Sequence, residues 1–118
     1  FSLGNTFTVT AWVTTTSTAG TQVLVSIGST PGAWGGFDVV LTNGGSVGIL
    51  DSCSNGVMTY LPGTSVATGI RTHIAVVKKG ANYNVFINGV SNKFTVAAGD
   101  CQNYNTNKVY LGWDAAIN

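Results

Sequence analysis

The stretch Arg71-Thr-His-Ile-Ala-Val-Val-Lys-Lys-Gly-Ala-Asn-Tyr-Asn-Val-Phe-Ile-Asn-Gly-Val90 decides the fold class of this 118-residue chain. Its first strand alternates through Ile74, Val76 and Lys78. A turn around Gly80 separates it from a second strand, which alternates through Tyr83, Val85 and Ile87. Asn88-Gly89 then predicts a type I′ hairpin turn, because both central positions of that turn need a positive φ. A third strand from about Val90 to Val96 completes an antiparallel meander.

The rest of the chain also alternates with the period of strands, and no segment of helical length shows helical periodicity. We expect six further strands, at residues 7–13, 22–27, 37–41, 46–50, 57–61 and 108–113. Polar, glycine-rich turns separate them at the spacing of a sandwich or jelly roll. The sequence therefore predicts a single all-β domain over residues 1–118, built from two antiparallel sheets.

Three segments of the chain resemble laminin-G-like domains of the concanavalin A-like jelly rolls. The meander is similar to the family pattern of a histidine strand followed by a "Tyr-x-Val-x-Ile-Asn-Gly" hairpin. Phe7-Thr-Val-Thr-Ala-Trp-Val13 is similar to its early strand, and Val109-Tyr-Leu-Gly-Trp-Asp114 to its late strand. The resemblance implies a concanavalin A-like sandwich with Trp12 in the core and His73 in a structural role.

In that family a further strand follows the late segment, and one often precedes the early segment. Here only Phe1–Asn5 precedes and the chain stops at Asn118. Two sheet edges are then left open, and open edges pair readily with other chains. Either the terminal strands have been removed, or a neighbouring subunit covers the edge by strand addition.

Charged residues make up only 8% of the chain, against about 25% in a typical domain, and the net charge is +1. Nucleic-acid binding needs clustered basic residues, so this composition argues against it. The one basic pair, Lys78-Lys79, is expected to be a solvated strand end. No apolar run reaches the roughly 18 residues of a membrane span.

Cys53 and Cys101 are the only cysteines, and their spacing fits neither a redox nor a zinc motif. We expect a Cys53–Cys101 disulfide in preference to two free thiols. Such a bridge would stabilise the fold by about 4 kcal/mol in the chain-entropy treatment. It would also place the protein in an oxidising compartment, which agrees with a secreted or extracellular, charge-poor β domain.

Catalysis is not expected. The chain has four carboxylates and no glutamate: Asp38, Asp51, Asp100 and Asp114. Jelly-roll glycosidases use a pair of carboxylates that flank the scissile bond, and no Asp-x-Asp pair occurs here. The single histidine, His73, has no nucleophile-elbow motif to accompany it.

The sequence also offers candidate calcium ligands, since calcium prefers carboxylate, amide and carbonyl oxygens. The residues that would supply them are Asp100, Asn103, Asn105 and Asp114, with Asp51 and Asn55 as a second group. We favour the other interpretation, in which these side chains form turns and satisfy local backbone N–H groups.

Sugar binding is the favoured function, because a sugar needs an exposed aromatic platform beside short polar groups. Trp34 lies between glycines that cannot bury it, although it could also fold back as a lid on the sandwich. The expected ligand-binding residues are Trp34, Tyr60, Asn103, Tyr104 and Trp113. The sequence thus suggests a non-catalytic, glycan-binding or adhesion module.

The rival interpretation is a structural subunit of an extracellular filament or coat. A Thr- and Ser-rich β domain with open edges suits assembly by self-association. In that case the chain ends, and not the loops, would carry the function.

Overall fold

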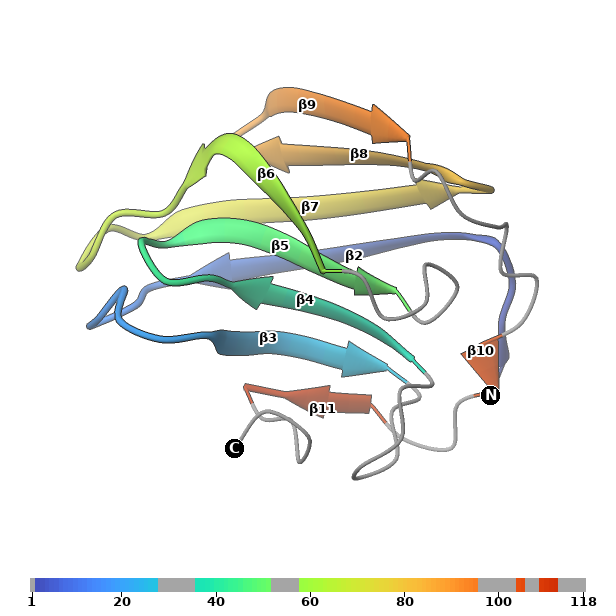
Figure 1. Cartoon of the computed structure of the whole chain (residues 1–118), viewed down its shortest axis with the longest axis horizontal. Helices are drawn as coiled ribbons and strands as arrows, with labels where there is room; N and C mark the ends of the chain where they lie inside the picture. The colour runs from blue at the N-terminus through green and yellow to red at the C-terminus, as the bar shows by residue number, and fades with distance from the viewer. Residues whose placement is uncertain (1, 28–35, 52–57, 96–103, 106–108, 113–118) are drawn as a thin grey trace.

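The computed structural model describes residues 2–27, 36–51, 58–95, 104–105 and 109–112. Within these residues every recorded strand pairing is antiparallel, and the two larger sheets pack face to face (Figure 1). The strands are β1 (Ser2–Leu3), β2 (Thr6–Val13), β3 (Gln22–Ile27), β4 (Phe37–Leu41), β5 (Ser46–Asp51), β6 (Met58–Ser65), β7 (Thr72–Lys79), β8 (Asn82–Ile87), β9 (Val90–Thr95), β10 (Tyr104–Asn105) and β11 (Val109–Leu111).

Among the described residues, one sheet has five strands in the order β11-β3-β4-β5-β6, and the other has four in the order β2-β7-β8-β9. A separate two-stranded pair joins β1 to β10. The predicted all-β, two-sheet sandwich is therefore confirmed. In the described part of the chain, β2 and β9 form the edges of the four-stranded sheet, and β11 and β6 form those of the five-stranded sheet.

The predicted meander is present as β7, β8 and β9. Ile87 pairs with Val90 across a two-residue turn, in which Asn88 has a φ of 49° and Gly89 a φ of 83°. These positive values are the ones a type I′ turn requires. The Asn88 amide oxygen also accepts a 2.8 Å hydrogen bond from the His73 N–H, which ties the turn to the neighbouring strand β7.

Strand β6 is longer than expected, because it continues through Pro62 to Ser65. Its position at the sheet edge tolerates a proline, since an edge strand leaves one side of its backbone unpaired. The pairing with β5 shifts register between Ser46 and Gly48. Near that irregularity the Val47 N–H donates a 3.3 Å hydrogen bond to the Thr64 hydroxyl.

The core lies between the two sheets and is formed by the inward row of each alternating strand. Its buried members are Val25, Ile27, Phe37, Val39, Leu41, Val47, Ile49, Val66, Ile74, Val76, Tyr83 and Val85. Burial of each large apolar side chain contributes about 1.5–3 kcal/mol. Phe37 of β4 joins the layers, because its ring stacks on Tyr83 at 6.0 Å and meets Phe7 edge-on at 5.0 Å.

Two expectations for single residues are wrong. Trp12 is 62% exposed and not in the core, because the inward positions of β2 are taken by Phe7, Val9 and Val13. Lys78 is 1% exposed and not a solvated strand end, because it shares the inward face with Val76. In both strands the two-residue period decides which way the side chain points.

Candidate functional site

Most of the residues predicted to bind a sugar, to bind calcium or to form a disulfide lie outside the described residues. These are Trp34, Cys53, Asn55, Asp100, Cys101, Asn103, Trp113 and Asp114. The backbone of Tyr60 lies in β6 opposite Gly48, in the five-stranded sheet. Tyr104 and Asn105 form β10 and pair with Leu3 and Ser2. The described backbone thus places Tyr60 in a different sheet from Tyr104 and Asn105.

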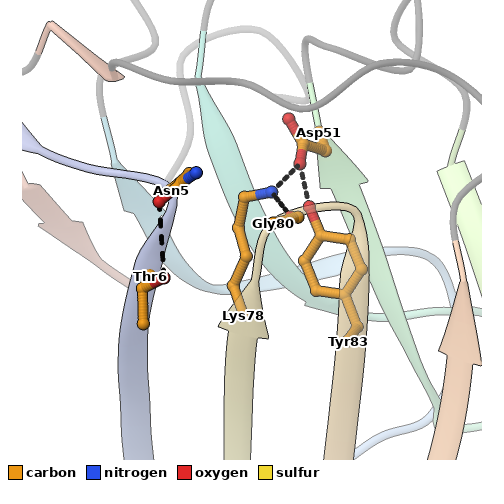
Figure 2. A network of polar contacts seen from close by, with 6 residues as sticks. All are labelled: Asn5, Thr6, Asp51, Lys78, Gly80 and Tyr83. Carbon is orange, nitrogen blue, oxygen red and sulfur yellow. Dashed lines mark hydrogen bonds and ion pairs between the residues drawn. The ribbon is translucent and has the colours of Figure 1, made fainter.

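A network of polar contacts crosses the sandwich at one end of the core (Figure 2). Asp51 ends β5, and its Oδ2 accepts a hydrogen bond from the Tyr83 hydroxyl. The Lys78 ammonium lies 3.7 Å from the same oxygen and also donates to the Gly80 carbonyl. The Lys78 and Asp51 side chains are 1% and 4% exposed. This buried pair joins the two sheets, and it occupies an Asp51 oxygen that was a candidate calcium ligand.

The five-stranded sheet carries a second polar group, on the face that points away from the core cluster. Asp38 and Ser26 are Cα partners in β4 and β3, and both are buried. Tyr110 of β11 continues the same row as the partner of Ser26. The sequence contained the signal for this row, because Phe37, Val39 and Leu41 alternate inward and so turn Asp38 outward.

The four-stranded sheet presents an aromatic and basic group on its outer face, which we call the Trp12 cluster: Trp12, Arg71 and His73. Trp12 and His73 are Cα partners across β2 and β7, and their rings lie 5.0 Å apart at an interplanar angle of 56°. The Arg71 guanidinium carbon lies 4.7 Å from the centroid of the Trp12 ring, within cation–π range. Sequence reasoning missed this cluster because it assigned Trp12 to the core.

The two described carboxylates do not form a glycosidase pair. Asp51 pairs in register with Phe37 on the inner face of the five-stranded sheet, whereas Asp38, the residue after Phe37, lies on the outer face. Two carboxyl groups on opposite faces of one sheet cannot flank a single glycosidic bond. No group of three or more His, Cys, Asp or Glu residues that could hold a metal ion occurs within the described residues.

None of the described segments contains a helix with the length and apolarity needed to cross a membrane.

A family model described as the concanavalin A-like lectin/glucanases superfamily, of the laminin-G type, matches residues 1–118. No curated protein sequence matches the chain. Among solved structures, the CBM40 module of the Ruminococcus gnavus IT-sialidase bound to α2,3-sialyllactose is similar, with a TM-score of 0.73 and 21% identity over 97% of this chain and 66% of that one. The same module bound to α2,6-sialyllactose gives a TM-score of 0.68 at 19% identity, with 97% and 68% covered.

Two further structures share the fold at lower similarity. The carbohydrate-binding module CBM66 from Bacillus subtilis has a TM-score of 0.59 and 14% identity, over 87% of this chain and 66% of that one. Domains LG4-5 of the mouse laminin α1 chain have a TM-score of 0.58 and 13% identity, over 98% of this chain and 33% of that one. The chain thus spans about two thirds of the length of the CBM40 and CBM66 structures, 66% in the first of them, and 33% of the laminin LG4-5 structure.

Proposed function

The chain belongs to the concanavalin A-like lectin/glucanases superfamily, and we propose that it is a non-catalytic carbohydrate-binding module that acts outside the cell. The observation that carries this proposal is the similarity of its sandwich, over 97% of its length, to a module solved with a bound sialylated sugar. The similarity to CBM66 adds a second structure whose description is carbohydrate binding.

The positions of the described carboxylates support a module without catalytic activity. Asp38 and Asp51 are both buried and lie on opposite faces of the five-stranded sheet. The Asp51 carboxylate is held by Lys78 and Tyr83, so it serves to join the sheets. Hydrolysis of a glycosidic bond needs two carboxyl groups that face one cleft.

The residues proposed to contact sugar are those expected from the sequence: Trp34, Tyr60, Asn103, Tyr104 and Trp113. Aromatic rings would stack on the C–H faces of a sugar while amides bond its hydroxyls. A calcium ion held by Asp100, Asn103, Asn105 and Asp114 is part of the same proposal, as is a disulfide between Cys53 and Cys101. If calcium binds there, adding calcium should raise the melting temperature of the protein, and a chelator should reverse that rise.

The experiment is a glycan array that includes both sialyllactoses, run on material whose mass is first measured by light scattering. We expect a monomer or small oligomer that binds defined glycans. Trp34→Ala or Trp113→Ala should weaken glycan binding while the circular dichroism spectrum stays unchanged. Val90→Ala is the control, because Val90 is 67% exposed and lies at the β8–β9 hairpin, among none of the proposed residues.

Two results would contradict the proposal. A silent array with a high-mass assembly that is lost on deletion of residues 1–5 or 114–118 would favour the structural subunit. Release of free sugar from a glycan substrate would instead identify an enzyme.

A further inference from the structure

The Trp12 cluster lies on a surface whose backbone is fixed by hydrogen bonds on both sides. Strands β2 and β7 pair over their full eight-residue lengths, which places Trp12 beside His73. On the other side, the Asn88 N–H donates to the His73 carbonyl at 2.9 Å, and the Asn88 amide oxygen accepts from the His73 N–H at 2.8 Å. The cluster is therefore formed before any ligand arrives, which lowers the ordering cost of binding.

The chemistry of the cluster combines an apolar platform with a fixed positive charge. The Trp12 side chain is 62% exposed, and the Arg71 guanidinium lies over its ring. Within the described segments both carboxylates are buried, and neither forms an ion pair with Arg71. An exposed indole matches the C–H face of a sugar, and a guanidinium matches a carboxylate through two parallel hydrogen bonds.

The neighbouring side chains on this face add neutral polar groups. Thr10 and Asn88 are exposed beside the cluster, and neither carries a charge that would repel an anion. Lys79 is a described lysine whose side chain is exposed on the same outer face. It is the cross-strand partner of Thr6, which lies six residues from Trp12 along β2. At a rise of about 3.3 Å per residue this is about 20 Å away, so among the described side chains the positive charge at the cluster belongs to Arg71.

We propose that the outer face of the four-stranded sheet is a second ligand site, at which Trp12 and Arg71 bind a sugar that carries a carboxylate. Trp12 supplies the stacking surface, Arg71 pairs with the carboxylate, and His73 and Asn88 position the two. The inference rests on the proposed function, because it names the class of sugar and adds a surface that the loop residues do not include.

The test follows the indole N–H signals of the nitrogen-15-labelled protein by NMR during titration with α2,3-sialyllactose. The Trp12 signal is assigned by its loss in Trp12→Phe. We expect it to shift with sialyllactose and to stay unmoved with lactose, the matched sugar without a carboxylate. Arg71→Gln should weaken sialyllactose binding at least about tenfold, since a hydrogen bond to a charged group is lost.

Lys79→Gln is the matched control, because it removes the same charge from the far end of the same face and should leave the affinity unchanged. Added salt should weaken the wild-type interaction, since the paired charges are exposed. A chain that binds sialyllactose on the array, but with affinity unaltered in Arg71→Gln and Trp12→Ala, would overturn this site and leave the proposed function standing. A chain that binds no sugar would overturn both.

An equal response of the Trp12 signal to lactose and sialyllactose would overturn the acidic class of ligand. If Arg71→Gln and Lys79→Gln lose the same amount of affinity for sialyllactose, the loss comes from the change in net charge and not from a site at Arg71. Both variants change exposed residues, so a preserved amide spectrum is expected and separates a binding defect from misfolding.

Discussion

Removal of the Lys78 ammonium is expected to destabilise the sandwich severely, although lysine substitutions in most proteins are harmless. Lys78 is 1% exposed, and its Nζ lies 3.7 Å from the Asp51 carboxylate. In Lys78→Met that carboxylate stays buried, keeps its bond from Tyr83 and loses its positive partner. The cost of breaking such a buried pair is about 3–5 kcal/mol.

That cost is a large part of the total, since the free energy of unfolding of a single domain is about 5–15 kcal/mol. Unfolding by urea, followed by circular dichroism, measures the difference directly. Urea is preferred to guanidinium chloride because it adds no ions that screen charges. Lys79→Met is the control: the neighbouring lysine is exposed, and its loss should change stability by no more than about 0.5 kcal/mol.

The double variant Asp51→Asn/Lys78→Met removes both charges together and distinguishes a pair from two independent groups. No unpaired charge is then left buried, so the double variant should lose less than the sum of the single variants. A coupling energy of about 2–3 kcal/mol is expected for groups in one contact network. Two results would refute the coupled buried pair: an equal loss of unfolding free energy in Lys78→Met and Lys79→Met, or single-variant losses that simply add in the double variant.

Three further changes test other parts of the molecule. Gly45→Ala should cost more than about 1 kcal/mol in thermal melts, because Gly45 has a φ of 78° and an added Cβ would lie 2.6 Å from the Val66 carbonyl oxygen. Gly89→Ala, at a φ of 83° but with open space around it, should cost only about 1 kcal/mol in the same assay. Mass spectrometry after alkylation should find Cys53 and Cys101 unreactive until a reductant is added, and reduction should lower the melting temperature.

The meander was predictable because local chemistry and long-range packing agree there. Tyr83 and Val85 alternate inward, and the positive φ values of Asn88 and Gly89 need no contact from elsewhere in the chain. A two-residue turn fixes the register of the strands on either side of it. One short segment thus determined three strands, and the order of the remaining segments determined the class of fold.

Lys78 shows where two sequence rules conflict. Composition places a lysine pair in solvent, whereas alternation from Ile74 and Val76 places Lys78 in the core. Alternation prevails because Asp51, 27 residues earlier in the sequence, ends β5 on the facing inner surface and supplies the negative charge. That pairing depends on how two sheets meet, so no local pattern reveals it.

The candidate site was harder to predict than the fold, because sites depend on which faces remain exposed after the sheets have packed. Trp12 illustrates the difficulty: the family resemblance favoured the core, and only the alternation of Phe7, Val9 and Val13 argued for the outer face. Once Trp12 is turned outward, the register of β2 on β7 brings it to His73 and within reach of Arg71. An aromatic residue that interrupts the polar side of an otherwise regular strand is therefore better interpreted as a surface group, and its cross-strand neighbours show which ligand it suits.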